Sequence, residues 1–168
     1  MRTAMLPARG PAPVPWQARR LHIRRAADME LRIVLIDENP TFQASVARFL
    51  GRIPGATVVA QFSDLPSAQA MLAPLRPDLV LMDVIAARHG FAEFCRVLHA
   101  LPARPALVCL SIYDEPQYRV ASAELGNIFV SKADLVAELL PILQRMGLQV
   151  PLEWQPPMPA GGAVDTGT

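Results

Sequence analysis

Short apolar runs alternate with segments of helical periodicity through the middle of this 168-residue chain. Five of the runs have the length and continuous apolar character of strands that are buried on both faces of a sheet. These runs are Leu31–Ile36, Ala56–Ala60, Leu79–Met82, Ala106–Leu110 and Ile128–Val130. Because a helical segment follows each strand, the connections are of the kind that joins parallel strands through right-handed crossovers. The pattern predicts an α/β fold with a doubly wound, five-stranded parallel sheet.

Five helices are predicted where apolar residues recur three or four positions apart. The first begins at Pro40, the third carries its apolar stripe around Phe94, and the fourth begins at Asp114. Asp64 and Asp134 precede the second and fifth helices, and a short carboxylate can accept hydrogen bonds from the free N–H groups of a first helical turn. We therefore predict that both residues cap their helices.

Two of these helices carry more specific expectations. The apolar stripe of the second helix predicts a buried face made of Ala68, Met71, Leu72 and Leu75. Pro141 lies inside the fifth helix. Because proline lacks a backbone donor, we predict a kink at this position.

The two ends of the chain differ in composition from its middle. Residues 1–29 contain four prolines and no stable periodicity, and six arginines against two acids give residues 1–30 a net charge of +4. We predict a disordered, basic, Pro-rich extension over residues 1–29, a single domain over 30–146, and a flexible Pro/Gly-rich tail over 147–168. A basic arm can attract nucleic acid. Arginine replaces lysine almost throughout the chain, so biased coding accounts for the charge and we expect no nucleic-acid partner.

Composition also bounds the compartment. No run approaches the length of a membrane-spanning helix, and the first residues lack the apolar stretch of a signal peptide. Cys95 and Cys109 both lie inside apolar runs and are predicted to be buried free thiols in a reducing compartment. We expect a cytoplasmic protein without a membrane partner.

Polar residues follow four of the predicted strands, at the sheet edge where doubly wound folds bind their ligands. Asp37 and Glu38 follow the first strand, Asp83 follows the third, Ser111 follows the fourth, and Lys132 lies just beyond the fifth. Three carboxylates at one edge repel each other, because two unit charges about 4 Å apart cost about 4 kcal/mol at an effective dielectric near 20. The cluster needs a counter-charge, and oxygen ligands favour a hard cation such as Mg²⁺.

The chemistry available to these residues is phosphoryl transfer onto a carboxylate. Asp83 can attack a phosphoryl group while the cation neutralises the phosphoryl oxygens. Ser111 can donate a hydrogen bond to the same group, and Lys132 can pair with it. Lys132 is the single lysine beside fifteen arginines. An ammonium is not interchangeable with a guanidinium, so its presence against the bias of the chain favours a role in the site.

Four segments, in their order and spacing, resemble response-regulator receiver domains and especially those of the NarL type. They are LRIVLIDENPTF, RPDLVLMD, LVCLSIYDEPQY and IFVSK, and the resemblance covers Leu31 to Met146. It implies a flavodoxin-like fold with the strand order 2-1-3-4-5. It further implies a protein of two-component signalling that is phosphorylated by a histidine kinase or a phosphotransfer protein.

The resemblance also implies roles for individual residues. Asp83 is similar to the phosphoacceptor of the family. Asp37 and Glu38 resemble the acidic pair that holds Mg²⁺, together with Asp83 and the backbone carbonyl of Ile85.

A switch is implied at two further positions. Ser111 resembles the switch hydroxyl and Phe129 occupies the position of the switch aromatic, although a plain core role fits Phe129 nearly as well. Phosphorylation would then draw Ser111 and Lys132 inward and turn Phe129 inward. This would change the partner affinity of the face made by the helix from Asp114, the strand with Phe129 and the last helix.

Two readings of function stay open. The first is a stand-alone receiver that is not an enzyme, accepts a phosphoryl group on Asp83 and signals by protein contact. The second is a pseudo-receiver, an interaction module that works without phosphorylation. It is motivated by Glu38, where the family usually has a second Asp, and by the loop VIAARHG, where the family commonly has a Met-Pro pair. Both readings are compatible with a homodimer.

Overall fold

The computed structural model describes residues 30–86, 90–113, 119–120 and 127–150. The expected extension, most of the expected tail and nearly all of the expected fourth helix lie outside the described residues.

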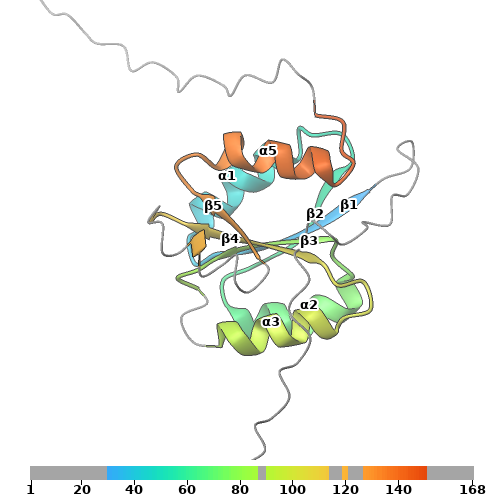
Figure 1. The fold of residues 1–168 in the computed structure, drawn as a ribbon, viewed down its shortest axis with the longest axis vertical. Coiled ribbons are helices and arrows are strands. Elements are labelled where there is room, and N and C mark those ends of the chain that lie inside the picture. The colour runs from blue at the N-terminus through green and yellow to red at the C-terminus, as the bar shows by residue number, and fades with distance from the viewer. Residues whose placement is uncertain (1–29, 87–89, 114–118, 121–126, 151–168) are drawn as a thin grey trace, which may run out of the picture.

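Five parallel strands form one sheet in the order β2-β1-β3-β4-β5 (Figure 1). The strands are β1 (Leu31–Ile36), β2 (Ala56–Phe62), β3 (Leu79–Asp83), β4 (Ala106–Ser111) and β5 (Ile128–Ser131). Every neighbouring pair is parallel. This confirms the predicted fold class and strand order. The order reverses between β1 and β3, and a reversal of this kind opens a crevice at the carboxyl ends of the two strands.

Helices cover both faces of the sheet (Figure 1). They are α1 (Pro40–Leu50) and α5 (Leu135–Arg145) on one face, and α2 (Leu65–Leu75) and α3 (Phe91–Ala100) on the other. Each pair encloses its own core, because strands buried on both faces send alternate side chains to opposite sides. Val34 and Val80 pack toward α2 and α3, whereas Ile33 and Leu81 pack toward α1 and α5.

The helix caps match the sequence in part. The Asp64 side chain accepts a hydrogen bond from Ser67 N at 2.8 Å, as predicted. This bond is the main reason that the pKa of Asp64 is lowered. Asp134 stands at the start of α5 but its side chain makes no capping hydrogen bond, so that prediction is wrong. Its backbone is not in the extended conformation that an N-cap usually has. The helix α5 runs through Pro141 as one element.

Burial is as predicted at most positions. Cys95 and Cys109 are buried free thiols, and burial raises the pKa of Cys95. Met71 is the exception, since it is 43% exposed while Leu72 is fully buried. At about 100° per residue, Met71 lies at the edge of the stripe that Leu65 and Leu72 define.

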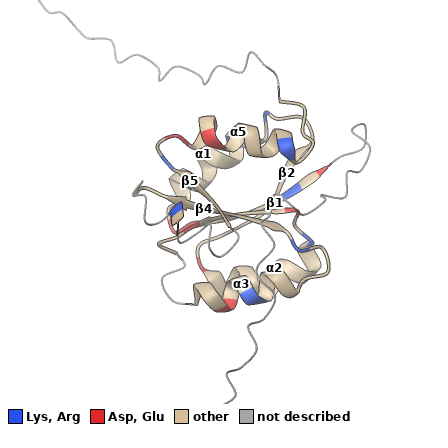
Figure 2. Ribbon diagram, viewed as in Figure 1, with Lys and Arg blue, Asp and Glu red and all other residues tan. Residues whose placement is uncertain are grey.

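The described part of the chain carries charged residues of both signs. Figure 2 shows basic and acidic residues mixed on both helical layers in that view. Among the described residues, no helix combines the length and the apolar character needed to cross a bilayer.

The adjacent residues Met71 and Leu72 provide a matched test of the core. Leu72→Ala should lower the free energy of unfolding by about 2–5 kcal/mol, because it removes buried methyl groups and leaves a cavity. Met71→Ala should cost less than about 1 kcal/mol, because the side chain is largely in solvent. Urea denaturation of both variants measures the difference. Equal losses would show that the assigned face of α2 is wrong.

Candidate functional site

Two aspartates lie side by side where β1 and β3 end. Ile36 and Met82 are partners in the β1–β3 register, so Asp37 and Asp83 follow at the same edge of the sheet. Both are buried, with exposed fractions of 3% and 6%. Burying two carboxylates is costly unless each is paired and hydrogen-bonded.

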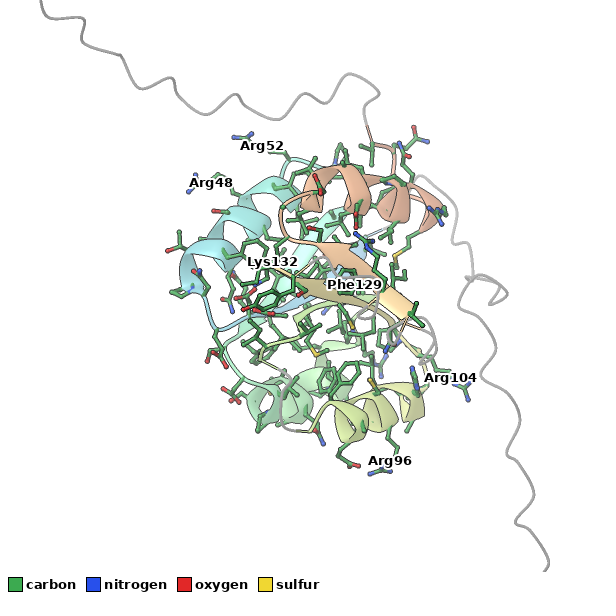
Figure 3. All side chains as sticks on the ribbon, turned by 60° about the vertical axis from the view of Figure 1, so that its left-hand side comes forward. Arg48, Arg52, Arg96, Arg104, Phe129 and Lys132 are labelled. Carbon is green, nitrogen blue, oxygen red and sulfur yellow. The ribbon has the colours of Figure 1, made fainter. Side chains whose placement is uncertain are left out.

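Lys132 supplies the pairing charge. Its Nζ lies 2.6 Å from Asp37 Oδ2 and 2.8 Å from Asp83 Oδ2. The lysine side chain is itself 10% exposed, so the three charged groups are largely out of water. In Figure 3, Lys132 lies against the edge of the sheet, whereas Arg48 and Arg96 point away from the molecule. The cluster carries two negative charges and one positive charge, which leaves a net charge of −1.

The second oxygen of each aspartate is held by its own loop. Asp37 Oδ1 accepts a hydrogen bond from Asn39 N at 2.8 Å, and Asp83 Oδ1 accepts one from Ile85 N at 2.9 Å. These are Asx turns, in which a side chain bonds the backbone two residues on. Each carboxylate is therefore oriented locally on one side and by the ammonium on the other.

Ser111 is fixed in a comparable way at the end of β4. Its hydroxyl accepts a hydrogen bond from Tyr113 N at 2.9 Å, and the side chain is fully buried. Its backbone carbonyl accepts a hydrogen bond from Lys132 N at 2.8 Å. The ends of β4 and β5 are thus tied together beside the charged cluster.

Two residues of α1 join the site that the sequence did not single out for it. The ring centroid of Phe42 lies 4.3 Å from Lys132 Nζ. Gln43 Nε2 donates to the carbonyls of Asp37 and Phe62, at 2.6 Å each, and so bridges the ends of β1 and β2. The only signal in the sequence was their position in the first turns of the helix that follows Asp37.

Glu38 does not join the cluster. Glu38 is exposed. Among the described residues, no three acidic, histidine or cysteine side chains lie close enough together to hold a metal ion. Glu38 therefore stands apart from the two buried aspartates in this structure, and its role as a metal ligand stays a prediction.

The remaining donors nonetheless suit Mg²⁺. This ion keeps several waters and is commonly held by one or two carboxylates together with phosphate oxygens. Asp37 and Asp83 provide two adjacent carboxylates, and the net charge of −1 favours a further cation. The residues present fit a two-carboxylate site rather than the three-carboxylate site expected from the sequence.

Phe129, the position implied to be a switch, is already buried at 8% exposed. The Arg119 guanidinium lies 4.9 Å from its ring centroid and pairs with Glu138 at 2.8 Å. Glu138 also accepts a hydrogen bond from Ser131 N at 3.1 Å. Arg119, which is paired with α5, thus covers one face of the ring. The Phe129 side chain is therefore already buried in this structure, before any phosphorylation could turn it inward.

The family model for the response regulator receiver domain matches residues 33–144. The chain belongs to this family. The match includes every residue of the charged cluster and, apart from the first two residues of β1 and the last residue of α5, all five strands and the helices α1, α2, α3 and α5. The protein thus contains a receiver domain of two-component response regulators.

Individual relatives agree with this assignment. A protein-glutamate methylesterase/protein-glutamine glutaminase from Anaeromyxobacter dehalogenans is 27% identical over 139 residues, which is 73% of this chain and 41% of the relative. The chain therefore spans less than half of the length of that relative.

Solved structures give the same fold. The receiver domain of NarL from Mycobacterium tuberculosis has a TM-score of 0.61 and 21% identity, covering 71% of this chain and 97% of that one. A chain from the complex of the P1 domain of CheA3 with CheY6 from R. sphaeroides has a TM-score of 0.59 and 24% identity, covering 70% of this chain and 97% of that one. At these identities, the likenesses establish the fold alone.

The shared ammonium gives a stability test. Lys132→Met should lower the free energy of unfolding by about 3 kcal/mol, because two buried carboxylates lose their counter-charge. Millimolar MgCl₂ should recover part of that loss in the variant, since a cation bound only by the folded state stabilises it. Urea denaturation with and without MgCl₂ measures both effects.

Arg48→Met is the matched control, because Arg48 is an exposed cation in the last turn of α1. It should cost less than about 1 kcal/mol and show no rescue by the metal. Equal losses in the two variants would mean that the charged cluster does not stabilise the fold.

Proposed function

We propose that this receiver accepts a phosphoryl group on Asp83 and signals in the cytoplasm through contacts with other proteins. The observation that carries the proposal is the buried cluster in which one ammonium pairs with Asp37 and Asp83 at 2.6 and 2.8 Å. Its net negative charge and its place at the switch point of the sheet suit a cation and a phosphoryl group together.

The reaction requires one substitution at phosphorus. A carboxylate oxygen of Asp83 attacks the phosphorus atom and forms a new P–O bond. The bond from phosphorus to the donor breaks, and its electron pair leaves with the donor, which is the imidazole nitrogen of a phosphohistidine on a histidine kinase or phosphotransfer protein. The similar complex of a CheA3 domain with CheY6 supports a protein donor.

Residues of this chain have defined tasks in that step. The Asx turn at Ile85 holds the Asp83 carboxylate in position for attack. Lys132 pairs with the charge on the phosphoryl oxygens, and the Ser111 hydroxyl donates a hydrogen bond to one of them. Asp37 and Asp83 would hold Mg²⁺, with the Ile85 carbonyl as a further ligand, and the ion would neutralise charge on the transferred group.

The downstream partner is proposed to bind the face of β5 and α5, together with the helix that the sequence predicts from Asp114. Val120, in the described part of that region, is 58% exposed. Arg119 lies over the Phe129 ring and pairs with Glu138 of α5, so a rearrangement of the ring would alter that face.

A pseudo-receiver is the second candidate, and one observation favours it. Glu38 is exposed and lies outside the cluster, so the site has one carboxylate fewer than the family resemblance implies. In this reading Lys132 acts as a permanent counter-ion, and partners bind whatever the state of Asp83.

Acetyl phosphate distinguishes the two candidates. With MgCl₂, it should convert the wild-type chain to a species that is retarded in phosphate-affinity electrophoresis, because Asp83 is the nucleophile. Asp83→Asn should give no retarded band. Asp64→Asn is the matched control, since it removes a half-buried carboxylate outside the site and asparagine caps a helix as well as aspartate does.

The absence of a retarded wild-type band, together with no response to beryllofluoride, would reject phosphoryl acceptance. Partner binding that is equal in the wild type and in Asp83→Ala would then support the pseudo-receiver.

A further inference from the structure

The Lys132 ammonium has a third neighbour besides the two carboxylates. An ammonium carries three N–H donors, and two of them are engaged by Asp37 and Asp83. On the remaining side, the face of the Phe42 ring lies 4.3 Å from Nζ. A cation within about 6 Å of a ring centroid is attracted by the ring quadrupole. Phe42 therefore provides a favourable electrostatic contact for the side of the ammonium that makes no hydrogen bond to an oxygen of the described residues.

The loop that orients Asp37 also fixes the backbone at the start of α1, which carries Phe42. Asn39 N donates to Asp37 Oδ1, and the Asn39 side chain in turn accepts from Thr41 N and Phe42 N at 3.0 and 3.1 Å. The first carboxylate and the backbone of Phe42 are thus linked through one residue. As a result, the Asp37 carboxylate and the residue that carries the ring are held by the same short loop beside the ammonium.

The surroundings of the ring are apolar. A small cavity beside Phe42 is lined chiefly by aliphatic side chains, among them Leu35, Val46, Leu81 and Leu110. Phe42 is itself half-buried, whereas the Lys132 side chain is only 10% exposed, and a cation–π contact is stronger when the cation is desolvated. The contact therefore favours the present place of the ammonium.

We propose that Phe42 is a positioning residue that holds Lys132 on the two carboxylates and thereby weakens their affinity for Mg²⁺. The metal and the ammonium are both attracted to Asp37 and Asp83, and two like charges at contact distance repel strongly. The ammonium must withdraw from at least one carboxylate when the metal binds. Any contact that stabilises its present place opposes the metal by the same free energy.

This inference rests on the Mg²⁺ site of the proposed function, but its test needs no phosphoryl group. The full chain is titrated with MgCl₂ alone, in the wild type, in Phe42→Leu, and with a trifluorinated phenylalanine at position 42. Fluorination weakens the ring quadrupole while keeping nearly the same shape. It therefore separates electrostatics from packing. Phe94, fully buried on the other face of the sheet, receives the same analogue as a control.

The single lysine makes a direct readout available. Labelling lysine with ¹³C and ¹⁵N gives one side-chain signal set, which belongs to Lys132 without further assignment. Protons next to Nζ should show a ring-current shift in the wild type that Phe42→Leu removes. Addition of MgCl₂ should move the wild-type signal in the same direction, because the ammonium leaves the ring.

Mg²⁺ affinity is expected to rise from the wild type through the fluorinated chain to Phe42→Leu. Phe42→Leu should bind Mg²⁺ about two- to fivefold more tightly than the wild type. The Phe94 control should match the wild type. Equal affinities across the series, no binding in any chain, or an unchanged lysine signal in Phe42→Leu would each overturn the inference. If the affinities follow the series while acetyl phosphate fails to phosphorylate the wild type, phosphoryl acceptance is rejected and the role of Phe42 stands.

Discussion

The structure depends on one ammonium that is shared by two buried carboxylates. Asp37 and Asp83 are at most 6% exposed, and neither could be buried as an ion without a positive charge at contact distance. That charge comes from Lys132, just beyond β5. In the sheet, β4 lies between β5 and β3, and both β4 and β3 lie between β5 and β1. Lysine suits this geometry because its flexible four-carbon stem spans the intervening strand and ends in a compact charge. A planar, forked guanidinium is matched to a single carboxylate rather than to two separate ones.

The sequence predicted the fold and most of the cluster because both follow from general rules. Apolar runs that alternate with helices imply a parallel sheet, and polar residues after strands then meet at one edge. This reasoning placed Asp37, Asp83 and Lys132 together. It could not tell that Glu38 would be exposed, because the direction of a side chain after a strand depends on the loop conformation.

The remaining differences have similar causes. From the sequence, Phe42 could be assigned only to the apolar face of its helix. Helical periodicity shows which residues are apolar, but it does not show which of them will lie beside a charged group. Met71 lies at the boundary of such a stripe, where a small rotation of the helix decides burial. Asp134 has the residue type of a cap without the backbone conformation of one. In each case, the tertiary arrangement decides between alternatives that are equal locally.

The end of β5 is where the site and the proposed partner surface meet. Lys132 N bonds the carbonyl of Ser111 inside the site, while the preceding amide, Ser131 N, bonds Glu138 on α5. Consecutive peptide groups thus serve the two regions, and Glu138 carries the contact on to Arg119 and the Phe129 ring. In the proposed function, this strand end is where a change of charge at Asp83 would reach the outer face, because adjacent residues of one strand contact the site and α5.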